Sequence, residues 1–374
     1  MEKDKIFWFG KRVLITGGDG FVASHLIKSL MNKGAVVVAT VLYKKPISTL
    51  EMIYSKEEKN NFMFPEIEEC DTLNFDELRR LCDRHQIDTI FHLSASSIVS
   101  DAANAPFSTI KNNVMGTVNI LEIARINKIP RVLIASSDKS YGDHATDDLE
   151  DIPYKENYAL KGLDVYSASK VSGDILAQTY SYQFKVPIIV ARSCNIFGPG
   201  DFNFSRLMPK TIMCLLDKRP PVIHQGNENV LREYIYIDDV VRAYMFLMEK
   251  VKDYYGDDNC NMPRTGKDTY GWAAFNVGSY TKDDVSNLSN CEKIKSVKDI
   301  IDLLRSKISD VSPIIKEKPA NFIEIPDQYL DFSKIKKLGF SPQVSFEDGL
   351  DISIDWYKDN YDYLKKIAYR YMNH

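Results

Sequence analysis

Short apolar segments alternate with segments of helical periodicity through the first half of this chain of 374 residues. The apolar segments are predicted to be buried strands at 12–16, 35–42, 89–93, 131–135 and 186–192. Helices are predicted at 24–31, 75–85, 107–127 and 165–184. Strands that are apolar along their whole length are covered on both faces, so the alternation predicts an α/β fold with a doubly wound parallel sheet.

The second half of the chain is mixed and less regular. Helices are predicted at 207–217, 298–305 and 349–363, and residues 253–269 are predicted to be an exposed polar insertion rich in Asp, Asn and Gly. This change of texture predicts a smaller C-terminal lobe that closes over a substrate. The expected boundaries are 1–195 with about 234–252 for the sheet domain, and 196–233 with 253–374 for the lobe.

Composition excludes several classes of protein. The chain has 48 basic and 52 acidic residues, a net charge of −4, which argues against nucleic acid or an anionic membrane as the main partner. It has no apolar run of ~18 residues, and its first residues lack the apolar core of a signal peptide. The six cysteines have no metal-ligand spacing and no CxxC pair. We therefore expect a cytoplasmic protein with reduced thiols, no membrane contact and no metal site.

A glycine loop joins the first predicted strand to the first predicted helix. Gly17, Gly20 and Ala23 form the pattern G-x-x-G-x-x-A. Small residues at such a turn let a pyrophosphate approach the backbone at the helix N-terminus, so the loop predicts dinucleotide binding. Asp71, after a third strand, is placed to hydrogen-bond adenine, and the alternative is that it caps the following helix.

The residues after the second strand leave the choice of dinucleotide open. A carboxylate there would bind the ribose hydroxyls of NAD, whereas a cation would favour NADP. The sequence at 41–45 is Val-Leu-Tyr-Lys-Lys, which contains no acid. Lys44 and Lys45 either hold a 2′-phosphate or are ordinary solvated lysines.

Two further motifs suggest acid–base chemistry. Ser137, Asp138 and Lys139 follow the strand at 131–135, and Tyr166 and Lys170 lie four residues apart, on one face of a helix. An ammonium near a phenol lowers its pKa, so Tyr166 could act as a general base while hydride leaves the same carbon. The ordinary alternatives are an exposed lysine beside a half-buried tyrosine, and a surface turn with a local ion pair at residues 138–139.

Taken together, these motifs resemble those of the extended short-chain dehydrogenases/reductases that act on nucleotide sugars, over nearly the whole chain. The segments that carry the resemblance, besides the loop and the Tyr-x-x-x-Lys pair, are His92-Leu-Ser-Ala-Ser-Ser97, 112–122, 232–239, 271–279, 330–340 and 354–357. The resemblance implies a Rossmann-like doubly wound parallel sheet with a smaller mixed C-terminal lobe that binds a nucleotide sugar. It also implies a homodimer formed through the helices at 107–127 and 165–184.

Asp138 and Lys139 point to one subgroup of that family. Epimerases resemble each other in having small, inert residues at these positions, whereas the 4,6-dehydratases carry an acid and a base there. The pair is Asp-Glu in the dTDP-glucose enzymes and Asp-Lys in the CDP-glucose enzymes, which this sequence resembles. The opening at 7–16, the loop at 43–51 and the segment 206–209 also resemble CDP-glucose 4,6-dehydratase. This likeness favours NAD as the coenzyme, with NADP as the alternative.

The resemblance implies a role for each candidate catalytic residue. Tyr166 removes the proton from the carbon-4 hydroxyl as NAD accepts the hydride, and Ser137 hydrogen-bonds the carbon-4 oxygen. Neutral Lys139 then removes the proton on carbon 5, and protonated Asp138 donates to the departing carbon-6 hydroxyl. Return of the hydride to carbon 6 gives a 4-keto-6-deoxy sugar without net oxidation.

Binding residues are also carried over by position. The residues expected at NAD are Gly17, Gly20, Phe21, Val22, Asp71, Thr72, Leu93, Ala95, Asn112, Tyr166 and Lys170. Those expected at the nucleotide sugar are Ser97, Asn195, Arg206 and Arg232. Ser137 in place of threonine and the loop ending in Ala23 depart from the closest subgroup. The alternatives are an epimerase or 4-ketoreductase, a dehydratase for a GDP-, UDP- or dTDP-sugar, and a non-catalytic NAD(P)-sensing protein.

Overall fold

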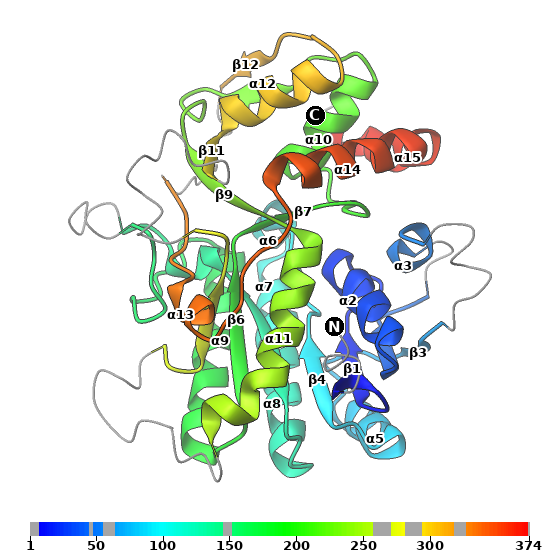
Figure 1. Ribbon diagram of the computed structural model, residues 1–374, viewed down its shortest axis with the longest axis vertical. Coiled ribbons are helices and arrows are strands. Elements are labelled where there is room, and N and C mark those ends of the chain that lie inside the picture. Colours follow the sequence, from blue (N-terminus) through cyan, green and yellow to red (C-terminus); the bar gives the residue numbers. More distant parts are fainter. Residues whose placement is uncertain are drawn as a thin grey trace.

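A seven-stranded sheet forms the centre of the molecule in a computed structural model (Figure 1), which describes residues 7–44, 48–54, 64–144, 152–256, 271–280, 294–317 and 327–372. Its strands are β1 (Arg12–Thr16), β2 (Val36–Val41), β3 (Glu66–Glu69), β4 (Thr89–His92), β5 (Val132–Ser137), β6 (Ile188–Ser193) and β10 (Ala274–Val277). Their order is β10-β6-β5-β4-β1-β2-β3, and every neighbouring pair is parallel. The predicted Rossmann-like sheet is therefore confirmed.

Alternate side chains of the inner strands enter two separate hydrophobic clusters. In β1, Val13 and Ile15 belong to one cluster, and Leu14 between them belongs to the other. All three are fully buried. Successive side chains of a strand point to opposite faces, so the apolar segments seen in the sequence exist because both faces of this sheet are covered.

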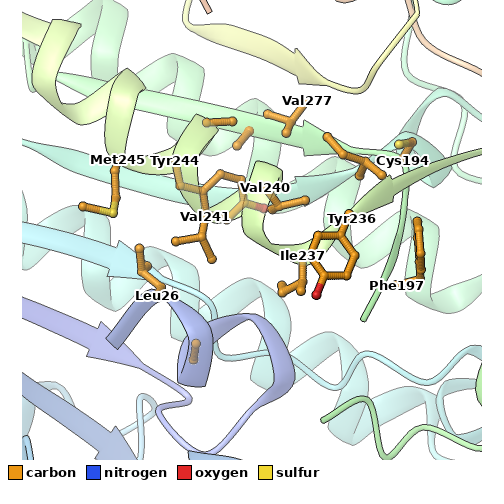
Figure 2. Close-up of a cluster of buried hydrophobic side chains, with 14 of the residues drawn as sticks. Leu26, Cys194, Phe197, Tyr236, Ile237, Val240, Val241, Tyr244, Met245 and Val277 are labelled. Carbon is orange, nitrogen blue, oxygen red and sulfur yellow. The ribbon is translucent and has the colours of Figure 1, made fainter. Parts of the chain in front are cut away.

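Helices cover both faces. On the first face, α2 (Phe21–Asn32) and α11 (Ile237–Tyr255) contact each other and the sheet. Figure 2 shows part of this cluster, with Leu26 of α2 near side chains of α11 such as Val241 and Met245. On the other face lie α5 (Phe75–His85), α8 (Gly116–Ile126) and α9 (Val165–Phe184).

The helix predicted at 107–127 is divided into three parts. They are α7 (Pro106–Ile110), a π-helical turn η1 (Lys111–Met115) and α8, and a short α6 (Val99–Asn104) precedes them. A π-turn inserts one residue into the helical repeat and so changes the direction of the side chains that follow it. The sequence shows only continuous periodicity here, which is why the interruption was not predicted.

A smaller lobe of mixed structure lies above the large sheet in Figure 1, and the predicted C-terminal lobe is confirmed. In one sheet, β9 (Leu231–Tyr236) pairs parallel with β7 (Asn195–Phe197) and antiparallel with β11 (Ile294–Ser296), and in another β8 (Val222–His224) pairs with β12 (Ile314–Lys316). The lobe's helices are α10 (Leu207–Leu216), α12 (Val297–Lys307), α14 (Phe346–Asp359) and α15 (Tyr361–Met372). The helix predicted at 349–363 therefore begins earlier, and it is interrupted at Asn360.

The exact domain boundaries stay a prediction. Strand β10 lies within 253–374, which was assigned to the lobe, yet it pairs with β6 in the large sheet. The other short elements are α3 (Thr49–Met52), the 3₁₀ turn η2 (Asp138–Tyr141) and α13 (Ser333–Lys337). Most of the predicted insertion at 253–269 lies outside the described residues. None of the helices in the described ranges combines the length and apolar character that a membrane span needs.

Candidate active site

The three glycines of the loop between β1 and α2 have little room for a Cβ atom. Gly17 has φ +70°, and a Cβ there would lie 3.0 Å from the Ser94 Cα. A Cβ on Gly18 would lie 2.6 Å from the Ala39 Cβ, and one on Gly20 3.1 Å from the Gly17 carbonyl oxygen. Gly20 is also the N-cap of α2 and supplies no capping side chain. Backbone N–H groups at this helix end are therefore left for an anionic ligand, which fits the pyrophosphate of a dinucleotide.

Thr16 and His92 hold the carboxyl ends of β1 and β4 together. Thr16 Oγ1 accepts hydrogen bonds from the N–H groups of Leu93 and Ser94, 3.1 Å each, and lies 2.8 Å from His92 Nδ1. His92 Nε2 lies 3.1 Å from Thr117 Oγ1. Burial, with a further contribution from the positive charge of Lys170, lowers the pKa of His92 to about 3. A neutral imidazole therefore fixes the strand end that includes Leu93 and Ala95.

Asp71 does not cap α5, as one interpretation of the sequence expected. The cap is Asn74, because α5 begins at Phe75, the residue directly after it. The Asn74 side-chain oxygen accepts from the Glu77 N–H at 3.2 Å. The Asp71 carboxylate accepts from the Leu73 N–H at 3.0 Å and is exposed, so its contact with adenine stays a prediction.

The remaining predicted coenzyme residues lie around the same strand ends. Phe21 and Val22 are half-buried in the first turn of α2. Thr72 is buried at α8, where a Cβ on Gly116 would lie 2.8 Å from its hydroxyl oxygen. Asn112 is exposed, and its amide lies 3.4 Å from the Ser96 hydroxyl.

Of the two adjacent asparagines, Asn112 and Asn113, it is Asn113 that faces inward, and it was not predicted from the sequence. Its Oδ1 accepts from the Ser96 N–H at 2.7 Å, and its Nδ2 donates to the Ser96 carbonyl and, at 2.9 Å, to Ser169 Oγ. Asn113 also lies four residues before Thr117, on the same helix face. The Thr117 hydroxyl donates a hydrogen bond to the backbone carbonyl of Asn113. That spacing was the available signal.

The turn η2 places Asp138 and Lys139 side by side at the end of β5. Ser137 is its N-cap, and the Ser137 hydroxyl donates to Asp138 Oδ1 at 3.0 Å. Lys139 Nζ lies 3.9 Å from the same oxygen. Asp138 is only 3% exposed, and its Oδ2 is buried without a hydrogen-bond partner among the described residues. Burial of Asp138 contradicts the surface position in the alternative interpretation, whereas the local ion pair of that interpretation is present, so the catalytic role of the pair stays a prediction.

Tyr166 and Lys170 lie in the first turns of α9, which Asp164 caps by accepting from the Ser167 N–H. Lys170 Nζ donates to the Ala135 carbonyl at 2.9 Å, and burial lowers the pKa of Lys170 to about 8. Lys170 is therefore not the exposed lysine of the ordinary alternative. The helix carries both side chains to the end of β5.

The charge acting on Tyr166 differs from the prediction. Burial raises the pKa of Tyr166 to about 12, although the positive charge of Arg206 and a hydrogen bond with Ser137 oppose the rise. The expected lowering by Lys170 is thus not seen, because the desolvation of the phenol outweighs the positive charge of Arg206 and the effect of Ser137.

The four predicted substrate residues lie in different settings. Arg206, the N-cap residue of α10, pairs with Asp201 at 2.9 Å and lies near Tyr166. Asn195 donates to the Glu233 carbonyl at 3.0 Å, and buried Arg232 donates to the Leu231 carbonyl at 2.8 Å. Ser97 is exposed beyond β4. The sequence thus selected residues from both lobes, and their contact with a sugar stays a prediction.

Comparison with protein-family models decides the family. Residues 13–261, more than half of the chain, match the model described as the NAD dependent epimerase/dehydratase family. The chain belongs to this family. The coenzyme predicted from the sequence, NAD, agrees with the family's description, and the Gly17–Gly20 turn fits it.

Curated relatives of this epimerase/dehydratase family member include 4,6-dehydratases. The chain is 27% identical over 363 residues to the human dTDP-D-glucose 4,6-dehydratase, covering 96% of this chain and 93% of that protein. It is 29% identical over 356 residues to a trifunctional UDP-glucose 4,6-dehydratase, 3,5-epimerase and reductase of Arabidopsis thaliana. That match covers 94% of this chain but spans 48% of the length of the plant protein.

Solved structures show the same fold. The dTDP-glucose 4,6-dehydratase of Bacillus anthracis, in complex with NAD, has a TM-score of 0.74 at 18% identity, covering 96% of this chain and 100% of that one. The UDP-glucuronic acid 4-epimerase of Bacillus cereus has a TM-score of 0.73 at 25% identity, covering 93% and 99%. Because both activities occur on this fold, the residues of the site have to distinguish them.

Two other buried residues of the site were not singled out from the sequence. Glu233 is fully buried, and its carboxylate accepts from the N–H groups of Ser279 and Leu330. Burial raises the pKa of Glu233 to about 7. Gln328, also fully buried, reaches Lys139 from the other lobe. Neither residue has a local sequence signal, because each meets its partners across long chain separations.

Proposed function

We propose that this family member is an NAD-dependent nucleotide-sugar 4,6-dehydratase, a hydro-lyase that produces a 4-keto-6-deoxy sugar. The observation that carries the proposal is the pairing of Asp138 with Lys139. A buried carboxylate oxygen without a partner is costly unless a proton or a ligand hydroxyl satisfies it. An amine 3.9 Å from the other oxygen supplies a base next to that acid.

The first chemical task belongs to Tyr166 and Ser137. Ser137 lies close enough to Tyr166 to lower the pKa of its phenol, so one sugar hydroxyl can meet both. Tyr166 removes the proton of the carbon-4 hydroxyl, and Ser137 then donates to the developing ketone oxygen. NAD, when bound, accepts the carbon-4 hydride and later returns it to carbon 6.

The second task belongs to Lys139 and Asp138. The carbon-4 ketone acidifies the proton on carbon 5, and the Lys139 amine removes it. Asp138 in its protonated form donates to the carbon-6 hydroxyl, which leaves as water. The Lys139 ammonium gives its proton back to carbon 5 as hydride reaches carbon 6. The proton that Tyr166 removed is released to solvent, and Asp138 takes up a proton again. The Asp138 Oδ2, which has no hydrogen-bond partner among the described residues, supports this role because a sugar hydroxyl can pair with it, and an epimerase needs neither group for its chemistry.

CDP-glucose is the substrate that we propose first, because the Asp-Lys pair resembles the enzymes specific for it. The relatives are named for dTDP-glucose and UDP-glucose, so these are the next candidates. We place Arg232 and Arg206 at the diphosphate, since guanidinium groups pair with phosphate oxygens in bidentate geometry. We also expect a cytoplasmic location.

The test is to incubate the purified protein with CDP-, dTDP-, UDP- and GDP-linked glucose or mannose and follow product mass. The proposal predicts that one sugar loses one molecule of water, without net accumulation of reduced coenzyme. An altered stereocentre at unchanged mass would instead establish an epimerase, the activity of several structural neighbours.

We further propose that the chain forms a homodimer through α7–α9. Large apolar side chains are exposed along these helices: Phe107, Ile110, Met115, Ile175 and Phe184. Phe107 is 80% exposed. Apolar side chains gathered on neighbouring helices are typical of an interface that a second copy covers.

A further inference from the structure

We infer that Gln328 is a positioning residue that holds Lys139 in place for proton removal and apart from Asp138. This inference rests on the proposed function. The residue lies 189 positions from Lys139 in the chain, in a segment that runs parallel to β9 at Arg232.

The amide of Gln328 contacts both members of the acid–base pair. Its Oε1 accepts a hydrogen bond from Lys139 Nζ at 2.8 Å. Its Nε2 donates to the backbone carbonyl of Asp138 at 2.9 Å. A carbonyl can only accept, so this second bond fixes which end of the amide faces the lysine.

Backbone hydrogen bonds and burial hold Gln328 in a fixed position. Its N–H donates to the Leu231 carbonyl at 3.1 Å, and its carbonyl accepts from the Glu233 N–H at 3.3 Å. The residue therefore pairs with β9 on either side of Arg232, and it is fully buried. A rigid, buried amide costs little additional entropy when it orders a second side chain.

Lys139 needs such a partner because of its own chemistry. A lysine has a flexible stem of four carbons and a compact charge that would otherwise move onto the nearest carboxylate. With Gln328 as the acceptor, Nζ stays 3.9 Å from Asp138 Oδ1, which is beyond hydrogen-bonding distance. The acid and the base therefore remain separate groups, and each can meet a different atom of the sugar.

The absence of charge on the Gln328 amide also suits the proposed role of Lys139. The carboxylates of Asp138 and Glu233 and the thiol of Cys194 lie close enough to interact electrostatically around this turn, and Lys139 acts on Cys194 as well. A carboxylate at position 328 would add a negative charge directly on Nζ and favour the ammonium form. An amide accepts the same hydrogen bond without that effect, so it suits a lysine that must act as a neutral base.

The test compares Gln328→Glu and Gln328→Leu with the neighbouring control Tyr329→Phe, which keeps the backbone segment and whose ring packs in a separate cluster with Tyr280 and Ile294. Each holoprotein is mixed with whichever nucleotide sugar the wild type dehydrates, and reduced coenzyme and product are followed in a single turnover. In Gln328→Leu we expect carbon-4 oxidation at the wild-type rate but elimination slowed at least tenfold, so reduced coenzyme accumulates.

In Gln328→Glu we expect the pH at which elimination becomes active to move upward by about one unit, since Lys139 holds its proton more strongly beside a carboxylate. Tyr329→Phe should match the wild type. Equal losses of oxidation and elimination in both variants, or an unchanged pH profile in Gln328→Glu, would overturn the inference and leave Gln328 a structural residue.

A readout without substrate separates this inference from the proposed function. In protein labelled with carbon-13 at the lysine ε position, the Lys139 signal is assigned by its absence from Lys139→Arg and then titrated. A higher midpoint in Gln328→Glu than in the wild type supports the contact even if no sugar loses water, in which case only the proposed function fails. An identical midpoint contradicts the inference whatever the activity.

Discussion

At the scale of single residues, the proposed mechanism divides two proton transfers between two pairs of side chains, Tyr166 with Ser137 and Asp138 with Lys139. Tyr166 and Ser137 lie close together, whereas Asp138 and Lys139 occupy the turn η2 beside them. Because the proposal assigns the pairs to different carbons of the sugar, it predicts that substitutions in one pair stop one step and leave the other. This separation of steps is the feature by which the site can be tested residue by residue.

Lys139→Ala removes the proposed base and leaves Tyr166 and Ser137 in place. We expect the variant to oxidise carbon 4 and then stop, so that reduced coenzyme accumulates up to the concentration of active sites. Elimination should fall by about a hundredfold or more, the usual contribution of a positioned base. Absorbance of reduced nicotinamide and product mass measure the two steps. Full turnover by Lys139→Ala would show that the role given to this lysine is wrong.

His92 makes the stability of the protein depend on pH. Its pKa in the folded state is about 3, below the ordinary value of 6.5, so the unfolded chain binds a proton first as the pH falls. The free energy of unfolding should therefore decrease with acidification, by about 2 kcal/mol between pH 7 and pH 5 from this residue. Denaturant unfolding at several pH values measures it.

The control for that experiment is His92→Gln, which cannot titrate in this range. Glu233, whose pKa is raised to about 7, contributes the opposite slope, but it is present in both proteins and cancels in the difference. We expect the wild type to lose about 2 kcal/mol more than His92→Gln over the same interval. Parallel curves for the two proteins would contradict the assignment of a neutral, buried imidazole.

At the scale of elements, the turn η2 sets where Asp138 and Lys139 lie. It begins at the carboxyl end of β5 and ends at Gly142, which has φ +68°. A Cβ on Gly142 would lie 2.0 Å from the Lys161 carbonyl oxygen, so the turn is packed directly against the segment that leads into α9. The sheet and α9 thus fix the acid–base pair through backbone contacts.

Gly142→Ala should consequently impair both activity and stability. Gly10→Ala is a matched control, because Gly10 also has a positive φ, +72°, and a Cβ there meets nothing within 4 Å. Gly10→Ala should cost only the backbone strain, about 1 kcal/mol. Gly142→Ala should cost several times more and reduce turnover at least tenfold, because the turn has to move. Equal effects of the two substitutions on thermal unfolding and turnover would contradict this account.

At the scale of the whole molecule, exposed apolar side chains on α7–α9 predict a dimer. Ile175 in α9 and Ile352 in α14 are almost equally exposed, at 47% and 49%, but only Ile175 lies on the proposed interface. A glutamate at position 175 would be buried unpaired on association, which is strongly unfavourable. In sedimentation experiments, Ile175→Glu should be monomeric and Ile352→Glu dimeric like the wild type. A monomeric wild type would remove the proposed interface.

The sequence predicted regular elements better than contacts between distant segments. The bounds expected for α5 and α9 are those observed, because each has clear periodicity and an Asn or Asp cap directly before it. The turn η1 was not predicted, since a π-turn leaves no mark in an apolar repeat. Asn113 could have been preferred to Asn112 from its spacing to Thr117, whereas nothing near Gln328 in the sequence indicates that it meets Lys139.

The most direct test of the central claim follows a deuterium placed at carbon 4 of the nucleotide sugar that the protein consumes. If Tyr166 assists hydride removal from carbon 4 and the same hydride returns after elimination, the product has lost water and carries the deuterium at carbon 6. Mass spectrometry and NMR of the product locate the label. Deuterium that remains at carbon 4, in a product of unchanged composition, would contradict dehydration by this site.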